Sequence, residues 1–405
     1  MTLPSNRYNR TKNDTTEPGS RIAWDFGPRR GWFRRGVNVL VMAVNIIAAM
    51  ALLLTGYGGL FNPEDWGGWV FFPMVFPVTL LASAFVFTID LIWWRRTALV
   101  QSVALLLCAG PIADFCPLNY PHLSMTESEK ANAIKIMTYN VFKFSDFTRA
   151  YEGNGNPTLD AILREDADIV CLQECMGMTL SRIGHSTPEQ IDSVFARYPY
   201  VYQGGKNTAL LSKFPAEPIP LQINSDTTVR NNGEGAAWRV HIDDSRIINL
   251  FNLHLRSLYL TRNDKEQFTG IVKDIVKLDT LNIDGMKFFR ANAMAKIAEA
   301  AKARADQIKN LEKYIAKYGG KNVIVCGDFN DVNGCYGINS LCHESRLRRA
   351  YPLAAFGPTF TFHANHLFFR IDHILFRGDL EPYSISSPRI PYSDHYPLVA
   401  TFIMK

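Results

Sequence analysis

Polar side chains that could perform acid–base or metal chemistry recur beside short apolar runs in the last two-thirds of the chain. A carboxylate at the end of a buried strand costs free energy unless it is paired or binds a cation. One such residue could be a capped turn or a local ion pair, but several at successive strand ends are better explained by one shared polar centre. The residues concerned are Asn140, Glu174, His254, Asp328, Asn330, Asp372, Asp394 and His395.

Short apolar runs bounded by turn residues would position these side chains. They have the pattern of buried strands and span residues 134–142, 167–175, 207–214, 246–255, 322–330 and 371–378. A stretch from Phe289 to Tyr318 carries apolar residues at helical spacing, including Ile297, Ile308 and Leu311. Strands outnumber helices in this region, so we expect packed sheets flanked by helices.

The order of the polar motifs carries a resemblance. TYN, LQE, NLHL, GDFND, RIDHIL and SDHYP follow one another between residues 134 and 403. In that order they resemble the endonuclease/exonuclease/phosphatase superfamily, which includes deoxyribonuclease-like endonucleases, abasic-site nucleases, inositol-polyphosphate phosphatases and neutral sphingomyelinases. The resemblance implies an α/β (α+β) fold, a four-layer α/β/β/α sandwich. It also implies a divalent-metal-dependent phosphoester hydrolase, and we expect a phosphodiesterase.

The metal site follows from the same resemblance. Glu174 is implied as the principal ligand, with Asn140 and Asp394 close to the cation. A hard cation bound largely by oxygen fits Mg²⁺ or Mn²⁺ better than zinc. Some abasic-site nucleases carry an acid two residues after this asparagine, where Phe142 stands here. That departure weakens the expectation of a second metal ligand in this loop.

The resemblance also implies catalytic roles for five residues. Asp328 would activate or position the attacking water, and Asn330 would hydrogen-bond a phosphate oxygen. His395 would act as a base or stabilise transition-state charge, oriented by Asp372, while His254 would donate to a non-bridging oxygen. These roles match the needs of phosphoester hydrolysis, which are an in-line nucleophile and neutralisation of charge on the phosphoryl oxygens.

Composition sets looser limits. A chain of 405 residues has room for one large or two ordinary domains, and its net charge of +5 is too small to imply a nucleic-acid partner by itself. The seven cysteines show no zinc-site spacing. Cys335 and Cys342 bracket a glycine-containing loop, so they could form a disulfide in an oxidising compartment.

Apolar residues are concentrated before residue 117. Residues 37–60 and 68–94 are long enough to span a hydrocarbon core. Residues 97–115 form a shorter candidate span that contains Pro111. A cleaved signal peptide is the alternative for the first segment, but its uncharged length and the two segments that follow argue against it. We therefore expect an integral membrane protein with about three transmembrane helices.

The flanking charges predict an orientation. Arginines precede the first span, Arg95 and Arg96 follow the second, and the intervening loop carries Glu64 and Asp65 without Lys or Arg. The positive-inside rule then makes the N-terminus cytoplasmic, and three crossings place the later residues on the extracytoplasmic side. The expected organisation is a cytoplasmic tail over 1–35, a transmembrane anchor over 36–117, a linker over 118–132 and a catalytic domain over 133–405.

The sequence is consistent with three alternatives for the function of this site. A phospholipid headgroup or other envelope phosphoester would gain effective concentration from a tethered enzyme. Extracytoplasmic nucleic acid would need a basic groove, yet basic residues such as Arg346, Arg348 and Arg349 are scattered. An inactive scaffold is a third alternative, although every motif residue is present. The sequence indicates no protein partner.

A long connection over residues 256–290 follows the NLHL motif. Its apolar residues fall at helical spacing over 268–276 and predict an amphipathic helix. Such a helix could pack on its own domain, cover the site as a lid, or rest against the bilayer.

Overall fold

The computed structural model describes residues 29–120, 124–148, 154–175, 183, 185–225, 233–258, 283–364 and 368–405. The chain divides into two compact units, Met1–Val44 and Asn45–Lys405, and the contacts described below lie within the second. The domain boundaries expected from the sequence stay a prediction. The helix expected over 268–276 lies outside the described residues.

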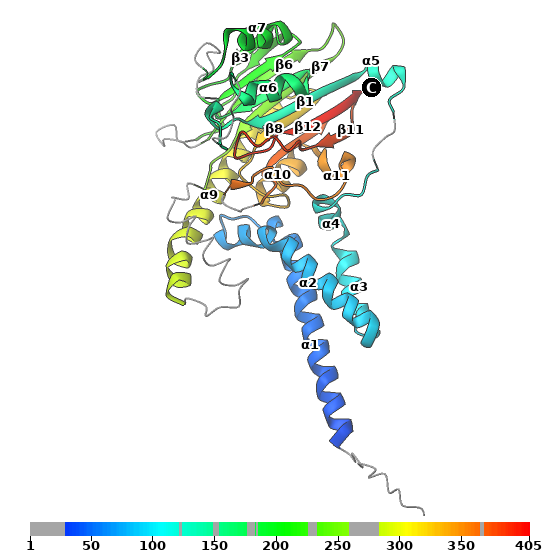
Figure 1. Cartoon of the computed structure of the whole chain (residues 1–405). Helices are drawn as coiled ribbons and strands as arrows, with labels where there is room; N and C mark the ends of the chain where they lie inside the picture. The colour runs from blue at the N-terminus through cyan, green and yellow to red at the C-terminus, as the bar shows by residue number, and fades with distance from the viewer. Residues whose placement is uncertain are drawn as a thin grey trace, which may run out of the picture. The chain divides into compact units, whose positions relative to one another are not determined.

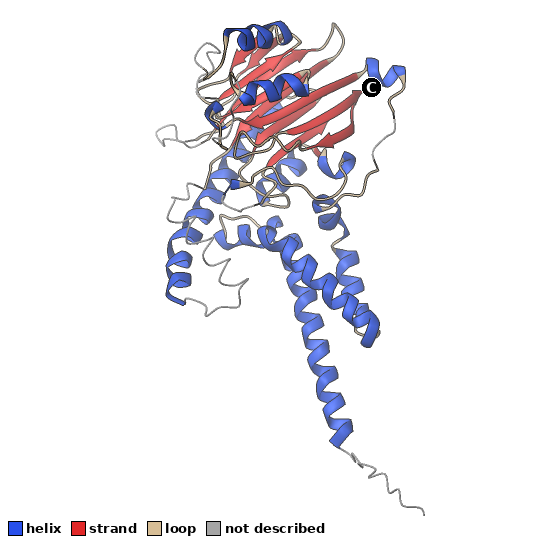
Figure 2. Ribbon diagram, in the orientation of Figure 1, coloured by secondary structure: helices blue, strands red, loops and turns tan. Residues whose placement is uncertain are grey.

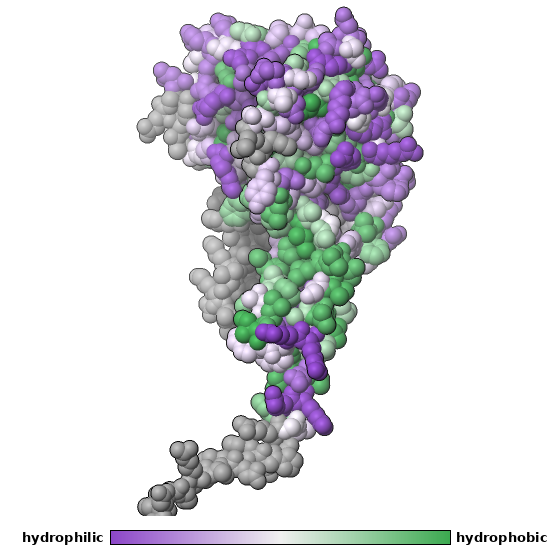
Figure 3. All heavy atoms as spheres, turned by 90° about the vertical axis from the view of Figure 1, so that its right-hand side faces the viewer, coloured by the Kyte–Doolittle hydropathy of each residue, from purple (hydrophilic) through white to green (hydrophobic). Residues whose placement is uncertain are grey.

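Apolar helices make up the first part of the described chain. Two stretches, Gly31–Leu60 and Gly67–Trp93, are long and apolar enough to cross a membrane, and a bent helix pair makes a third if it counts as one span. Hydrophobic side chains gather over this helical part, and hydrophilic ones over the sheets (Figure 3). The elements are α1 (Arg29–Tyr57), η1 (Gly58–Leu60), η2 (Gly67–Val70), α2 (Phe71–Trp93), α3 (Ala98–Leu107) and α4 (Ala109–Phe115).

The third apolar segment is not the single straight helix that its composition indicates. It is divided into α3 and α4, which meet at an angle of 65°. Pro111 has no N–H to donate to the carbonyl of Leu107, four residues earlier, and its ring crowds that carbonyl. The hydroxyl of Tyr57 donates a hydrogen bond to the freed oxygen instead. The bend therefore has a local cause and a compensating partner.

Two six-stranded sheets follow. The first has the order β11-β12-β1-β2-β4-β3 and the second β5-β6-β7-β8-β10-β9. β1 and β12, far apart in sequence, lie side by side (Figure 1). The first sheet comprises β1 (Ala133–Asn140), β2 (Ile169–Gln173), β3 (Tyr200–Gln203), β4 (Thr208–Ser212), β11 (Leu380–Ser386) and β12 (Leu398–Met404). The second comprises β5 (Ala216–Ile219), β6 (Glu234–His241), β7 (Ile247–His254), β8 (Val323–Asp328), β9 (Arg348–Arg349) and β10 (Asp372–Arg377).

Helices cover the outer faces of the two sheets (Figure 2). One apolar core lies between the sheets, a second joins the first sheet to α6 and α7, and a third joins the second sheet to α9 and α10. The expected four-layer α/β/β/α sandwich is confirmed. The helices of this part are α5 (Glu127–Ala131), η3 (Phe142–Phe144), α6 (Pro157–Glu165), α7 (Pro188–Arg197), α9 (Ile283–Tyr318), α10 (Tyr336–Glu344) and α11 (Tyr351–Ala354).

All six predicted strands are present, as is the predicted helix, which begins six residues earlier at Ile283 in α9. Six further strands, β3, β5, β6, β9, β11 and β12, were not predicted. β3 and β5 are only four residues long and largely solvent-accessible, so they lack a continuous apolar run. β1 illustrates why the central strands carry apolar residues on both faces. Ile134 and Ile136 point into the core between the sheets, while Met137 and Tyr139 pack in the outer core.

Strand register brings the polar strand ends together. β7 and β8 are parallel and pair His254 with Asp328, while β10 is antiparallel to β8 and pairs Asp372 with the same residue. In the other sheet, β1 and β2 are parallel and pair Asn140 with Gln173. The end of each parallel strand and the start of β10 therefore meet at one edge of the sandwich.

Buried polar contacts join the apolar helices to the sandwich. Arg370 Nη2 donates to the backbone oxygen of Asp114 at 2.7 Å, and its distance to Asp114 Oδ1 is 3.4 Å. Asn339 donates to the carbonyl of Gly59 at 2.9 Å. A Cβ on Gly59 would lie 1.8 Å from the carbonyl oxygen of Gly334, so glycine permits this close approach. We call the Asp114 and Gly59 contacts the joint.

Candidate active site

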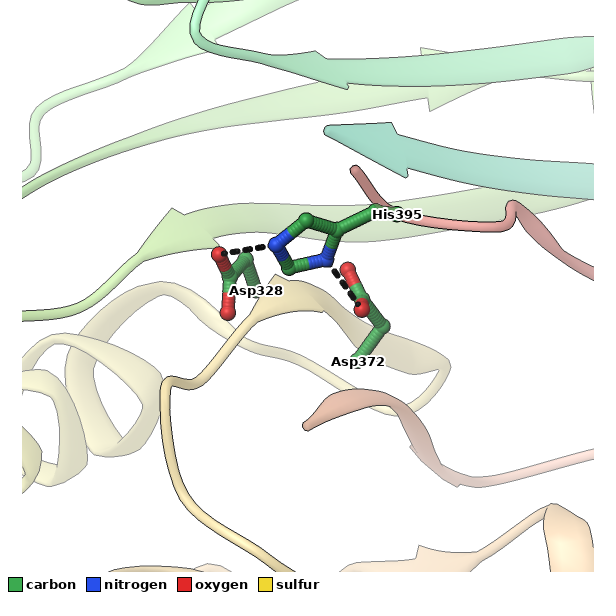
Figure 4. Close-up of side chains that lie close together, drawn as sticks. All are labelled: Asp328, Asp372 and His395. Carbon is green, nitrogen blue, oxygen red and sulfur yellow. Dashed lines mark hydrogen bonds and ion pairs between the residues drawn. The ribbon is translucent and has the colours of Figure 1, made fainter. Parts of the chain in front are cut away.

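A histidine between two aspartates lies at the centre of the polar edge. Nδ1 of His395 is 2.8 Å from Oδ2 of Asp372, and its Nε2 is 3.6 Å from Oδ2 of Asp328 (Figure 4). All three side chains are buried. Their ligand atoms lie within 4.8 Å of one another. The backbone N–H of Asp372 donates to Thr361 Oγ1, outside the strand, at 3.1 Å.

The charges of these groups are strongly coupled. Burial lowers the pKa of His395, but the carboxylates of Asp372 and Asp328 outweigh it and raise that pKa to about 10. Burial is the main reason that the pKa of Asp328 is raised. The nearby Asp372 carboxylate adds to the rise, and His395 and His254 oppose it. The arrangement holds a proton-binding imidazole between two acids.

Glu174 and Asn140 lie beside this group. Asn140 Nδ2 donates to Glu174 Oε1 at 3.2 Å and to Asp328 Oδ2 at 3.0 Å, so it connects the two sheets. His254 Nε2 is 3.7 Å from Glu174 Oε1 and 3.8 Å from Asp328 Oδ2. The structure thus brings together residues from β1, β7 and β8 and the residue directly after β2.

Asp394 and Asn330 complete the predicted set. The pKa of Asp394 is raised mainly by burial, with further contributions from the carboxylates of Glu174 and Asp328. The backbone N–H of Asn330 donates to Asp328 Oδ1 at 2.8 Å, and its side-chain amide donates to the carbonyl of Leu255 at 3.1 Å. Every site residue named from the sequence therefore lies in this region or contacts it.

Backbone conformation at the site is unusual. Glu174 has φ 53° and Asn330 has φ 51°, in the left-handed region that non-glycine residues seldom adopt. Such conformations persist where the surroundings fix them. The carbonyl of Glu174 accepts a hydrogen bond from the N–H of Lys143 at 2.9 Å. Both residues line the adjoining cavity.

Buried hydrogen bonds connect residues that are adjacent to the site. Gln173 Nε2 donates to Asn252 Oδ1 at 2.6 Å, and Asn252 Nδ2 donates to the carbonyl of Leu172 at 3.0 Å. Ser393 Oγ donates to the carbonyl of Asn140 at 2.6 Å. Gln173 and Asn252 were not singled out from the sequence, because a polar residue within a strand gives no sign of its cross-sheet partner. Ser393 lies in the loop between β11 and β12.

The donor set fits a divalent cation. The three carboxylates of Glu174, Asp328 and Asp394 influence one another, and repulsion among such groups is what a bound cation offsets. The Glu174 side chain is 29% exposed and lines the adjoining cavity, so it is accessible to an ion. In contrast, His395 is already hydrogen-bonded to Asp372, so we assign that pair to orientation of the imidazole.

The site opens into a cavity of about 320 Å³. One side is polar and contains Glu174, Asp328 and His395. The other side is apolar and contains Val70 and Met74, which belong to η2 and α2. Arg304 of α9 also lines the cavity, with its Nη2 2.8 Å from Asp331 Oδ1. None of these three additional residues was predicted for the site.

The two cysteines that could have formed a disulfide are free thiols. Cys335 is buried and Cys342 is half-buried, and burial raises the pKa of both. They precede and belong to α10 respectively, on the side of the sandwich that carries α9.

Comparison with protein families gives two matches. Residues 137–395 match the model of the endonuclease/exonuclease/phosphatase family. Residues 38–115 match a model described as a domain of unknown function. No curated protein matches the chain.

Several solved structures are similar to about two-thirds of the chain. An endonuclease/exonuclease/phosphatase family protein from Bacteroides thetaiotaomicron is 14% identical, with coverage of 67% of this chain and 98% of that one and a TM-score of 0.42. The human Nocturnin catalytic domain is 19% identical, with coverage of 68% and 94% and a TM-score of 0.42. ANGEL2, described as a 2',3'-cyclic phosphatase, is 15% identical, with coverage of 67% and 95% and a TM-score of 0.42.

Proposed function

Because this chain belongs to the endonuclease/exonuclease/phosphatase family, whose members hydrolyse phosphoesters and generally depend on divalent metals, we propose that it is a membrane-anchored, metal-dependent phosphodiesterase. The observation that carries the proposal is the convergence of Glu174, Asp328 and His395 at one edge of the sandwich, beside a cavity. Loss of any one of these groups should stop hydrolysis.

The metal is proposed to be Mg²⁺ or Mn²⁺, held by Glu174 with Asn140 and Asp394 nearby. When bound, it would neutralise charge on the phosphoryl oxygens as a Lewis acid. The oxygen-rich donor set supports a hard cation. The amide nitrogen of Asn140 donates to Glu174 and Asp328. Its oxygen Oδ1 accepts a hydrogen bond from the backbone N–H of Phe142 at 3.2 Å.

Each catalytic residue has its own role in the proposed reaction. Asp328 positions the water and takes its proton as the new oxygen–phosphorus bond forms and the bond to the leaving oxygen breaks. His395, oriented by Asp372, stabilises the developing charge and supplies the proton that the leaving oxygen needs to become an alcohol. His254 and Asn330 donate to phosphoryl oxygens. The products are a phosphomonoester and an alcohol.

Membrane insertion belongs to the same proposal. The apolar stretches Gly31–Leu60 and Gly67–Trp93 support two crossings, and α3 with α4 would make the third as one broken span. Three crossings with a cytoplasmic N-terminus put the sandwich on the extracytoplasmic side. A reporter fused after Lys405 should then be active outside the cytoplasm. Activity of that fusion only in the cytoplasm would contradict this orientation.

Nucleic acid is the second candidate substrate, and it has less support. A nuclease groove needs cations that follow the phosphates. Among the residues described around the cavity, the permanently charged cation is Arg304, and its guanidinium is already paired with Asp331. A phosphodiester that carries a single phosphate would need fewer basic side chains around the cavity than a polynucleotide strand.

A direct assay tests the proposal. The full chain in detergent should hydrolyse bis(p-nitrophenyl) phosphate with Mg²⁺ or Mn²⁺, lose activity with excess chelator and regain it with added metal. Glu174→Ala and His395→Ala should each abolish turnover, whereas Asp192→Asn, at an exposed position on α7, serves as a matched surface control. Full activity of either site variant would refute the assignment.

A further inference from the structure

We infer that the substrate of this site is a phosphoester carrying an apolar chain, and that Val70 and Met74 of the anchor bind that chain. The inference rests on the proposed hydrolase function and adds a substrate class to it. It also makes the anchor a part of the substrate site. The source of such a substrate would be the phospholipid of the bilayer that holds the anchor.

The cavity has two chemically distinct sides. The catalytic groups, among them Asp328 and His395, form one side. Val70, Ile297 and Val332 contribute to the other. Both sides belong to a single hollow, so a molecule whose phosphorus reaches Asp328 would place the neighbouring atoms of its ester group against the apolar side. A purely polar substrate would leave that side without matching contacts.

The apolar side is built into the fold. Val70 is only 7% exposed and packs in one cluster with Ile297, Ala301 and Val332. Close packing of η2 on α9 depends on Gly67, where an added Cβ would lie 2.5 Å from Cβ of Ala298. Val70 is therefore held in place by the tertiary structure. This apolar side of the cavity, which we call the wall, is thus preformed.

The apolar surface continues beyond the catalytic cavity. A second cavity of about 270 Å³ shares Met74, Val332 and Phe369 with the first. Its other lining residues include Pro73 and Pro77 of α2. An apolar chain that begins at the phosphoester could thus extend along α2 while keeping contact with apolar side chains.

The start of α2 has the features of a membrane interface. Val70 lies within the candidate span that begins at Gly67. Just before it, Phe61 stacks on Trp69 at 4.4 Å between ring centroids, and Trp66 meets Trp69 edge to face at 5.1 Å. Aromatic side chains of this kind favour the boundary between headgroups and hydrocarbon. The wall therefore lies where lipid molecules present their phosphoesters.

The charge of the cavity agrees with this substrate. Arg304 Nη2 pairs with Asp331, and its Nη1 donates to the carbonyl of Arg256 at 3.0 Å. Because its guanidinium already has protein partners, Arg304 adds no free positive charge for further phosphates. A polynucleotide strand would present several phosphates and would require further cations.

A homologous series of alkyl p-nitrophenyl phosphates, from methyl to octyl, tests the inference below the concentrations at which the esters aggregate. The leaving group is constant, so chain length alone changes. For the full chain in detergent, kcat/KM should rise with length by up to about fourfold per methylene until the wall is covered. The slope should fall in Val70→Ser and in Met74→Ser.

Matched variants separate loss of the wall from loss of the fold. Val70→Leu and Met74→Leu keep an apolar side chain and should retain the slope. Val78→Ser changes a residue of α2 that is 67% exposed and does not line the cavity, so it controls for a polar residue in this helix. Each variant is compared with the wild type by its thermal midpoint.

The outcomes distinguish the two proposals. Hydrolysis of the methyl ester without any dependence on chain length would overturn the apolar-chain inference and leave the hydrolase intact. A wild-type slope in the folded Val70→Ser and Met74→Ser variants would overturn the assignment of the wall. Preference for a single-stranded oligonucleotide over the octyl ester would favour a nuclease. No hydrolysis of any ester would refute the proposed function itself.

Discussion

Nδ1 of His395 lies 2.8 Å from Oδ2 of Asp372, and both side chains are buried where β10 begins. The other nitrogen of the imidazole faces Asp328 at 3.6 Å. The hydrogen bond from Nδ1 to Asp372 fixes the orientation of the imidazole ring. In the proposed mechanism, Asp372 is therefore a positioning residue that acts through His395.

Asp372→Asn should lower kcat by about 10²-fold or more, because the neutral amide no longer stabilises a protonated imidazole or selects its tautomer. Steady-state kinetics at saturating Mg²⁺ measure the effect, with Asp192→Asn as the surface control. The metal concentration that gives half-maximal activity should stay the same. A large rise in that concentration would show that Asp372 is instead a metal ligand.

Glu174→Gln should weaken Mn²⁺ binding by at least about tenfold, because an amide is a poorer ligand than a carboxylate of the same shape. Electron paramagnetic resonance of free Mn²⁺ measures binding without reference to turnover. Glu189→Gln, on α7, provides an acid-to-amide control away from the site. Equal affinity in the wild type and in Glu174→Gln would rule out Glu174 as the principal ligand.

Asp114→Asn should destabilise the joint by about 3 kcal/mol, because it leaves the buried guanidinium of Arg370 without its countercharge. Burial already lowers the pKa of Arg370, and the Asp114 carboxylate opposes that effect. Denaturant unfolding in detergent measures the change. Glu127→Gln, which breaks an exposed ion pair with Lys130, should have no measurable effect. Equal losses in both variants would contradict a special role for the joint.

His373 should make the protein less stable as the pH falls below about 6.5. Burial, with a smaller contribution from Arg370, lowers its pKa to about 3, and its Nε2 lies 2.9 Å from the carbonyl of Asp331. The unfolded chain binds the proton first, so the stabilisation is complete above pH 6.5 and is lost toward pH 3, by up to about 1.4 kcal/mol per unit.

The comparison of wild type with His373→Gln isolates this contribution. Glutamine can still donate to the carbonyl of Asp331 but does not titrate. Unfolding free energies measured between pH 7 and pH 4.5 should fall less steeply in the variant. Parallel pH profiles for the two proteins would mean that His373 does not govern acid stability.

The motif residues could be predicted because each follows or begins a strand, and strand ends meet at a sheet edge. Asp328 is the clearest example, since its β-strand VIVCGD is buried throughout. Arg304 could not be predicted. It is a basic residue within a long helix, where exposure is the usual expectation. Its partner Asp331 comes close only in the tertiary structure.

The apolar wall could not be predicted from the sequence for a related reason. Val70 and Met74 lie in a segment whose hydrophobicity is fully accounted for by a membrane span. Hydropathy reports how apolar a residue is and not which neighbour it packs against. The packing of η2 on α9, together with the joint, brings this segment to Asp328 and His395. The bend at Cys108 was likewise indicated only in part, through the presence of Pro111.

The joint has a kinetic meaning for the proposed enzyme. Arg370 and Asn339 bind the backbone of Asp114 and Gly59 directly, so little free chain separates the site from the helices. An enzyme on a long linker would meet substrate that diffuses in three dimensions, whereas one attached this way would meet substrate that diffuses within the plane of the membrane. Its encounters would depend on lateral diffusion of substrate within the bilayer. Turnover would then follow the mole fraction of that substrate among its neighbouring lipids, and dilution with inert lipid would slow the reaction even at constant bulk concentration.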